Sequence, residues 1–382
     1  MTKLAETFRI QKGCVYPHPN ADRLDLIDVY GDGRTVAIVK RGEFAEGEIA
    51  IFINSLGDPM VPVDDERFAF LLGNAKADGF ARVRVAKLRG IESRGLVIKA
   101  VVDMTDEDMD VSESLGLVKW TPWRYSTRRG HAGGSGYNLG PMRCESGPKH
   151  LLPCEKYDIE GLGKMHRLLI PGEMVVITEK VHGANGCIFH DGDRLWVRSR
   201  SQFKKRADEG EREDAWWQAV NHAALEQKLS DMPHLQNLAL YGEVYGEVQD
   251  LHYGLKGIGA RFVLFDVWHI NDRRWLPWSE VKAIAAELDV PTVPVLYEGP
   301  WYVEEVNERT RPHVDVYALA EGPSVLAGIN GMVKPHTREG IVITPQPERY
   351  DMRYGRVKFK WVGTGYSTRK EETSDVTIEE EV

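Results

Sequence analysis

The 382-residue sequence lacks an apolar run near the roughly 20 residues that a membrane-spanning helix requires. Residues 1–9 also lack the apolar core of a secretion signal. The composition, 42% hydrophobic and 28% charged, is typical of a soluble globular protein. These absences predict a cytoplasmic protein that has no membrane partner.

Cysteine is scarce, and basic residues are not in excess. The four cysteines, Cys14, Cys144, Cys154 and Cys187, form no C-x-x-C pair and have no histidine at zinc-binding spacing, so we expect buried or free thiols rather than a zinc site. With 49 lysines and arginines against 58 aspartates and glutamates, the formal net charge is −9. This balance excludes a uniformly basic surface but leaves room for a local basic groove.

The first part of the chain is rich in short β-segments separated by turns. Residues 24–30, 35–39, 50–53, 81–86 and 95–102 alternate in polarity or are rich in β-branched side chains. This pattern predicts an all-β domain, either a small antiparallel barrel or a sandwich, and we place it at residues 1–118.

Two segments of this domain, Pro17–Leu24 and Lys87–Leu96, resemble paired motifs of the OB-type tRNA-binding domains that are attached to some aminoacyl-tRNA synthetases. The resemblance implies an N-terminal all-β OB-type barrel whose strand face and loops contact RNA. Turn chemistry explains the Pro, Asn and Gly residues of both segments equally well, so the role of the barrel stays open.

The composition changes again beyond residue 118. Residues 119–147 are rich in Gly, Ser and Arg and have no hydrophobic period, which predicts a linker with either phosphate-binding or simply solvated arginines. Residues 148–370 mix strand and helix patterns, which predicts an α/β domain. Residues 371–382 form an acidic tail that we expect to be disordered.

Five lysines begin a Lys-x-x-Gly tetrad: Lys76, Lys87, Lys180, Lys256 and Lys360. The tetrad alone does not discriminate among them, and that of Lys76, Lys-Ala-Asp-Gly, is closer to the general Lys-x-Asp-Gly form than that of Lys180, Lys-Val-His-Gly. Context selects Lys180, because an apolar strand at residues 174–177 precedes it and a Gly-Ala-Asn-Gly turn follows it. Such a turn would hold the amine at a strand edge, over a pocket.

A lysine that attacks phosphorus must be deprotonated, yet the ordinary pKa of its side chain is about 10.4. Neighbouring cations or burial can lower that pKa. The alternating segment Val357–Trp361 places Lys358 and Lys360 on one face. Two adjacent lysines suit a triphosphate, although a solvated strand face has the same pattern.

Other candidate side chains lie at strand ends in the second domain. Glu243 follows a glycine and Glu339 precedes a buried strand, and either carboxylate could hold a divalent metal or bind ribose hydroxyls. Phe265 ends an apolar strand, where it could stack on a purine or pack in the core. Residues 196–206, which include Arg200, form the clearest basic run and could meet phosphates or a ribose.

The order of these residues carries more information than any one of them. The series resembles the motifs of the covalent nucleotidyltransferase superfamily, which includes RNA ligases, DNA ligases and mRNA capping enzymes. Within it, residues 180–185, with His182 in place of the usual Asp, are similar to the RNA ligase variant. DNA ligases and capping enzymes carry an OB domain after the last of these motifs, but only 22 residues follow Lys360 here, too few for a barrel. The OB-like domain of this chain precedes the transferase instead. This arrangement resembles RNA ligase family five, whose members act on nicks with an RNA 3′-OH strand.

The resemblance implies a fold, a reaction and a role for each residue. The fold is an α+β nucleotidyltransferase domain, ATP-grasp-like and built on antiparallel sheets. The reaction is ATP-dependent sealing of 3′-OH and 5′-phosphate ends through a lysyl-AMP intermediate with Mg²⁺ or Mn²⁺, by a monomer acting on nicked or broken nucleic acid. The implied roles are Lys180 as nucleophile, Glu179 and Phe265 at the adenine, Arg200 and Glu243 at the ribose, Glu339 and Asn185 at the metal, Lys358 and Lys360 at the phosphates, and His182 at the AMP phosphate, at the incoming strand or packed at the turn.

Two classes of alternative stay open. A DNA ligase or a capping-type guanylyltransferase uses the same motifs on another substrate or nucleotide. A noncatalytic RNA-binding adaptor would rely on the N-terminal barrel alone, and the retained lysines and acids argue against it.

Overall fold

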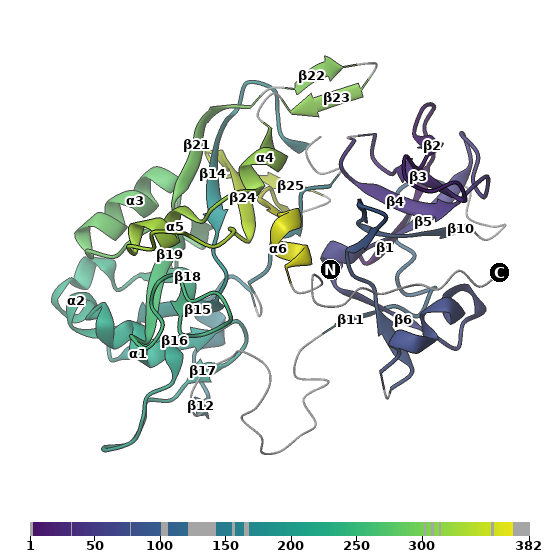
Figure 1. The fold of residues 1–382 in the computed structure, drawn as a ribbon. Coiled ribbons are helices and arrows are strands. Elements are labelled where there is room, and N and C mark those ends of the chain that lie inside the picture. Colours follow the sequence, from purple (N-terminus) through teal and green to yellow (C-terminus); the bar gives the residue numbers. More distant parts are fainter. Residues whose placement is uncertain are drawn as a thin grey trace.

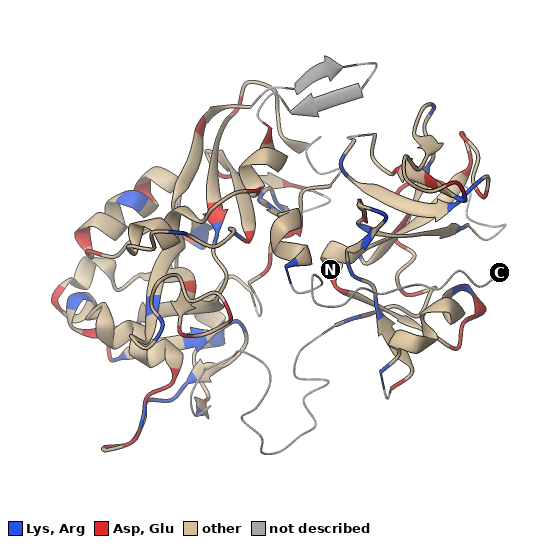
Figure 2. Ribbon diagram, viewed as in Figure 1, with Lys and Arg blue, Asp and Glu red and all other residues tan. Residues whose placement is uncertain are grey.

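The computed structural model describes residues 3–31, 33–76, 78–100, 106–120, 143–154, 157–163, 168–301, 303–306, 309–312, 315–352 and 355–369. Figure 1 shows an N-terminal domain in purple and blue and a larger C-terminal domain in teal to yellow. Most of the predicted linker and the whole acidic tail lie outside these residues. Charges of both signs occur over both domains, in agreement with the balanced composition (Figure 2).

The N-terminal domain is built from short antiparallel strands. They pair in the orders β1-β5-β10, β2-β3-β4 and β11-β6-β7, with a separate β8-β9 hairpin. The strands are β1 (Ala5–Arg9), β2 (Val15–Pro17), β3 (Leu24–Asp28), β4 (Val36–Lys40), β5 (Ile49–Asn54), β6 (Pro59–Pro62), β7 (Phe80–Arg82), β8 (Ala86–Leu88), β9 (Ile91–Ser93), β10 (Gly95–Lys99) and β11 (Val118–Lys119). Across the described part of this domain the pairings give separate sheets, so the closed barrel that the sequence suggested is not seen.

Strand β5 shows why the domain has two cores. Alternation places Ile51 and Ile53 on one face and Ala50 and Phe52 on the other. All four side chains are completely buried. The first pair packs with residues of β6 and β7, and the second pair packs with residues of β3 and β4.

The C-terminal domain contains a seven-stranded sheet, ordered β12-β17-β16-β15-β18-β19-β20, and a five-stranded sheet, ordered β13-β27-β24-β14-β21. Every strand pair in these two sheets is antiparallel except β13 with β27. The strands are β12 (Cys144–Glu145), β13 (Glu160–Gly161), β14 (Met174–Lys180), β15 (Ala184–His190), β16 (Leu195–Ser199), β17 (Phe203–Lys204), β18 (Leu238–Gly246), β19 (Ala260–His269), β20 (Arg274–Trp275), β21 (Val295–Pro300), β24 (Gly340–Gln346) and β27 (Phe359–Val362).

Helices are short in this domain. They are α1 (Ala215–His222), α2 (Leu225–Asp231), α3 (Trp278–Glu287), α4 (Val316–Ala320), α5 (Val325–Ile329) and α6 (Thr364–Thr368), and two small hairpins pair β22 (Val303–Val306) with β23 (Arg309–Pro312) and β25 (Tyr350–Asp351) with β26 (Gly355–Arg356). Helices α1 and α3 pack on the seven-stranded sheet (Figure 1). Helix α1 begins at Ala215 because the Asp214 carboxylate accepts a hydrogen bond from Trp217 N. Among the residues placed by the structure, no helix has the length and apolar character needed to cross a membrane.

Candidate functional site

A pocket of about 210 Å³ lies between the two sheets of the C-terminal domain. Strands β14, β24 and β27 contribute to one side, and strands β15, β18 and β19 with helix α3 contribute to the other. The apolar lining includes Val176, Val342, Phe265, Leu276, Trp278 and Val281, and the charged lining includes Asp158, Lys180, Arg200, Glu243, Lys358 and Lys360. A lining of this mixed kind suits a ligand with a flat apolar part and a phosphate part.

Lys180 is the last residue of β14, and the strand geometry determines where its side chain points. Val176, Thr178 and Lys180 alternate along the face that lines the pocket. Strand β14 pairs with β24 so that Lys180 lies opposite Gly340, the residue after Glu339. As a result, Lys180 Nζ donates a hydrogen bond to Glu339 Oε1 at 2.6 Å.

Two carboxylates keep Lys180 in its charged form. Burial by itself would lower the pKa of Lys180, but Glu339 and Glu243 outweigh burial and raise the pKa. Burial would also raise the pKa of Glu339, but Lys180 and His182 lower it to about 2. In this arrangement Lys180 is an ammonium ion. A nucleophilic lysine was expected to have a pKa lowered by neighbouring cations or by burial. Lys180 is buried, but the effect of the two acidic side chains on its pKa is larger than that of burial.

Glu243 on β18 has the opposite shift. Burial raises the pKa of Glu243 to about 8, against the effect of Lys180 and with a contribution from Glu339. The shift favours the protonated form of Glu243, which can donate as well as accept a hydrogen bond, and the ionised form of the same group adds to the attraction that keeps Lys180 charged. Ribose hydroxyls both donate and accept, so a group of this kind can bind them.

Close packing requires the glycine in the Lys180 tetrad. A Cβ on Gly183 would lie 2.3 Å from Val244 O and 2.8 Å from Glu243 Cγ. The chain after Lys180 therefore approaches β18 at a distance that only glycine allows. At Gly79, in another of the five tetrads, a Cβ would have nothing within 4 Å.

Lys358 and Lys360 both line the pocket, and each is paired with a carboxylate. Lys358 Nζ donates to Asp266 Oδ2 at 2.8 Å, and Arg356 binds the same carboxylate at 2.6 and 2.8 Å. Lys360 Nζ donates to Asp158 Oδ1 at 3.2 Å. Burial lowers the pKa of both lysines, although their carboxylate partners act in the opposite direction.

Asp158 is the centre of a cation cluster that the sequence analysis did not single out. Its carboxylate accepts hydrogen bonds from Arg200 Nη2 at 2.6 Å and Lys119 Nζ at 3.1 Å, in addition to Lys360. Burial would raise the pKa of Asp158, but the three cations hold it well below its usual range. Arg200 and Lys360 of this cluster line the pocket together with Asp158. No spacing in the sequence joins Asp158 to residues so far along the chain.

Phe265 on β19 is half-buried and forms part of the pocket wall. Its ring packs on Tyr157 with centroids 5.3 Å apart and planes tilted by 44°. Tyr157 is held in place in turn, because its hydroxyl donates to Asp266 Oδ2 at 2.8 Å. Core packing and exposure to the pocket, the two environments expected for Phe265, therefore occur together.

Glu179 is part of the pocket lining, so its expected place at the adenine stays a prediction, but its carboxylate lies elsewhere. Glu179 alternates with Lys180 on β14, so its side chain points to the opposite face of the sheet. Its carboxylate accepts hydrogen bonds from Ser324 Oγ at 2.5 Å and Val325 N at 2.8 Å at the start of α5. Because the Glu179 carboxylate makes these contacts, the main chain of Glu179 is the part of the residue that can face the pocket.

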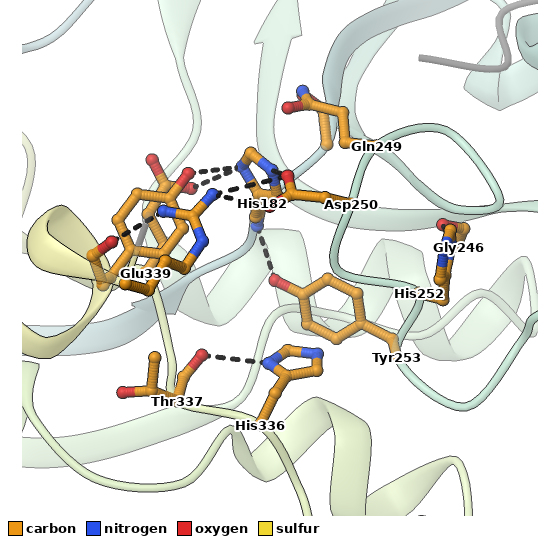
Figure 3. A network of polar contacts seen from close by, with 12 residues as sticks. His182, Gly246, Gln249, Asp250, His252, Tyr253, His336, Thr337 and Glu339 are labelled. Carbon is orange, nitrogen blue, oxygen red and sulfur yellow. Dashed lines mark hydrogen bonds and ion pairs between the residues drawn. The ribbon is translucent and has the colours of Figure 1, made fainter. Parts of the chain in front are cut away.

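Asn185 and His182 have different environments. Asn185 lines the pocket from β15, where its backbone oxygen accepts a hydrogen bond from Trp216 Nε1 at 2.9 Å. His182 is outside the pocket lining. Figure 3 shows its ring between Asp250 and Glu339, with Nε2 at 2.9 Å from Asp250 Oδ1 and Nδ1 at 3.7 Å from Glu339 Oε2.

The described residues gather no group of three or more His, Cys, Asp or Glu side chains suited to a metal ion. Mg²⁺ sites in proteins often use one or two carboxylates together with phosphates and water. Glu339, ionised and next to the pocket, fits this type.

Two family models match the chain: one for an OB-fold domain over residues 5–100 and one for RNA ligase over residues 173–362. No curated protein matches it. Solved structures of Naegleria gruberi RNA ligase have a similar fold. A variant with ATP and Mn is 24% identical with a TM-score of 0.73, and the match covers 97% of this chain and 100% of that one. The same ligase with PPi is 24% identical with a TM-score of 0.73, over 98% and 100% of the two chains.

The chain therefore combines an N-terminal match to an OB-fold domain with a C-terminal match to RNA ligase, and the pocket lies between the two sheets of the C-terminal domain. Residues 173–362 match the model of the RNA ligase family.

Proposed function

We propose that the protein is an ATP-dependent RNA ligase that seals 3′-OH and 5′-phosphate ends through a Lys180–AMP intermediate. The observation that carries the proposal is the position of Lys180, 2.6 Å from Glu339 and at the wall of a pocket that also presents Phe265 and several cations. The pocket lies mainly within the residues that match the RNA ligase family. The Naegleria structures with ATP and with AMP support an adenine nucleotide as the ligand.

The reaction consists of three displacements at phosphorus. First, Lys180 Nζ attacks the α-phosphorus of ATP, a P–N bond forms, the bond to pyrophosphate breaks and the amine loses its protons. Second, an oxygen of the 5′-phosphate attacks the same phosphorus, and Lys180 leaves. Third, the 3′-OH loses its proton and attacks the activated 5′-phosphate, and AMP leaves.

The side chains around the pocket have separate roles in this scheme. Phe265 stacks on the adenine. Glu243 and Arg200 bind the ribose hydroxyls. Lys358 and Lys360 supply positive charge to the phosphates as pyrophosphate departs.

Mg²⁺ or Mn²⁺ would be held by the Glu339 carboxylate, with Asn185 reaching it directly or through water. Such an ion would polarise the phosphate oxygens and offset the negative charge that Glu339 places beside Lys180. Lys180 would then be easier to deprotonate, because Glu339 is the largest favourable partner of its charged form.

We infer that the substrate is a nick with an RNA 3′-OH strand and that the N-terminal domain contributes to binding it. OB folds bind single strands and structured RNA. Lys119, on β11 of the N-terminal domain, reaches Asp158 in the cation cluster at the pocket. This contact supports a phosphate-binding surface to which both domains contribute.

Labelling with α-³²P ATP, α-³²P GTP and labelled NAD in parallel, followed by sealing of nicks with RNA or DNA 3′-OH strands, tests the proposal. We expect label from ATP alone and faster sealing of the RNA 3′-OH nick. Label from GTP would indicate a capping-type enzyme, and label from NAD or a preference for DNA would indicate a DNA ligase. The absence of any label would support a noncatalytic adaptor.

A further inference from the structure

Helix α6 lies between the two domains (Figure 1). It follows β27 directly, and its first residues are tied to the C-terminal domain. Gly363 N donates to Glu339 O at 2.9 Å, and Thr364 N donates to Glu321 Oε1 at 2.6 Å. The start of the helix is therefore connected to the backbone of the residue that pairs with Lys180.

The N-terminal domain holds the same helix through Glu92 and Arg94. Arg94 is 5% exposed, and its Nη2 donates to Thr364 Oγ1 at 2.6 Å. Its guanidinium lies over the Trp361 ring at 4.5 Å from the centroid. The Thr364 hydroxyl donates to Glu92 Oε2 at 2.7 Å. This part of the segment that resembles a tRNA-binding motif is thus buried against the ligase domain.

The other end of α6 contacts His182 and Asp250. Tyr366 Oη lies 2.7 Å from His182 Nδ1, and their rings pack edge to face at 5.2 Å. Arg369, just after the helix, donates to Asp250 Oδ2 at 3.1 Å. Asp250 in turn contacts His182 Nε2 (Figure 3).

These contacts fix the orientation of the His182 ring. Both ring nitrogens are engaged, Nδ1 by Tyr366 and Nε2 by Asp250, so the ring cannot rotate without breaking two hydrogen bonds. The His182 backbone is also held, because its N–H donates to Tyr253 Oη at 2.6 Å. The fixed ring lies beside Glu339, the carboxylate that pairs with Lys180.

We propose that α6 is a positioning element of the active site, through which Glu92 and Arg94 of the N-terminal domain set the orientation of His182 beside Glu339. This inference rests on the proposed function for its consequence in catalysis. Arg94 acts through Thr364 and Tyr366, which are two positions apart on α6. The N-terminal domain would then contribute to the geometry at Lys180 as well as to substrate binding.

A purely structural role for the interface would predict a different result. Arg34 and Asp315 also form an ion pair between the two domains, at 3.4 Å and with both side chains about half exposed. Arg34→Ala removes an interdomain contact, to Asp315 and to the Tyr317 ring, in which no residue of α6 takes part, and is the matched control. Arg94→Ala and Thr364→Val both remove the contact to α6, and the second is nearly isosteric.

The test uses the full-length protein labelled with ¹³C,¹⁵N-histidine. The ring resonances of His182 are assigned by their loss in His182→Gln. We expect Arg94→Ala and Thr364→Val to shift these resonances and to slow nick sealing about tenfold, as the loss of groups that orient a site carboxylate does elsewhere. Arg34→Ala should leave both unchanged. Circular dichroism confirms that each variant is folded.

Unchanged His182 resonances in folded Arg94→Ala and Thr364→Val would overturn the proposal, even if sealing slowed. Equal shifts in Arg34→Ala would overturn it too, because they would show a general effect of the interface. The resonances do not depend on activity. A wild-type protein that formed no enzyme–AMP would therefore refute the proposed function and leave the positioning of His182 to be decided by the spectra.

Discussion

Lys180 Nζ and Glu339 Oε1 lie 2.6 Å apart, and the pairing of two strands brings the two residues together. Lys180 ends β14 and Glu339 directly precedes β24, and the two strands pair up to that point. On the other side of β24, a Cβ on Gly340 would lie 2.0 Å from Trp361 O, so the strand beside it is packed as closely as glycine permits. The sheet therefore determines where the two residues of the ion pair lie.

Glu243 should make the protein less stable as pH rises. Its pKa in the folded protein is about 8, above the ordinary value of 4.5, so between these two values the folded state holds a proton that the unfolded state has lost. The contribution of Glu243 to stability therefore falls as pH increases from about 4.5 to 8. Urea unfolding at pH 5 and pH 8 in EDTA measures this.

Glu243→Gln removes this contribution, so the variant should lose less stability between pH 5 and pH 8 than the wild type. The exposed Glu280→Gln should behave as the wild type does. Equal pH dependence in Glu243→Gln and wild type would show that Glu243 is ionised throughout.

Gly183→Ala should disrupt the turn after the nucleophile. The added methyl group would meet Val244 O at 2.3 Å, and backbone on both sides must move to relieve the contact. We expect a loss of about 1–3 kcal/mol in the free energy of unfolding, the usual cost of overpacking, together with weaker enzyme–AMP formation. Gly73→Ala, where a Cβ meets nothing within 4 Å, is the control. Identical urea midpoints for the two variants would contradict the packing argument.

Asp266→Asn should be strongly destabilising. Asp266 is 2% exposed, and it is the shared partner of Arg356 and Lys358. Removing its charge leaves two buried cations without that partner, which typically costs about 3–5 kcal/mol. Chemical denaturation measures the loss, with the exposed Asp272→Asn as control. A loss below about 1 kcal/mol would show that Glu348, the second partner of Arg356, compensates.

Asp158→Asn should bind ATP more tightly. The Asp158 carboxylate is paired with Lys119, Arg200 and Lys360, and Arg200 and Lys360 line the pocket. Removing the negative charge leaves them for the ligand, and we expect the Kd for ATP to fall about tenfold, or ~1.4 kcal/mol. Titration calorimetry with the exposed Asp193→Asn as control checks this. Weaker binding would show that Asp158 orients the cations more than it competes for them.

The sequence predicted which residues lie on the same strand face and which belong to one series of motifs. It did not predict which side chains form hydrogen bonds or ion pairs with them. Alternation predicted that Lys358 and Lys360 share a face, and both line the pocket. It could not predict their carboxylates, because Asp266 and Asp158 are 92 and 202 positions away in the chain. Pairing at such separations is decided by tertiary packing.

Glu179 shows that a position next to the nucleophile in the sequence does not determine where a side chain points. Its place next to the nucleophile suggested a ligand contact, but alternation along β14 sends its side chain to the other face of the sheet, where it caps α5. The contact of His182 with Tyr366 was equally inaccessible, since 184 positions separate them. The domain order was readable because the β-rich and mixed segments differ in composition, whereas barrel closure depends on strand pairing that composition does not specify.

Mapping the covalent adduct tests the central claim most directly. The protein is incubated with ATP and Mn²⁺, digested at alkaline pH to preserve the P–N bond, and analysed by mass spectrometry, with Lys180→Ala and Lys76→Ala in parallel. If Lys180 is the nucleophile, AMP is found on the peptide that contains Lys180, is lost in Lys180→Ala and is retained in Lys76→Ala. AMP on another lysine, or undiminished labelling of Lys180→Ala, would contradict this role of Lys180.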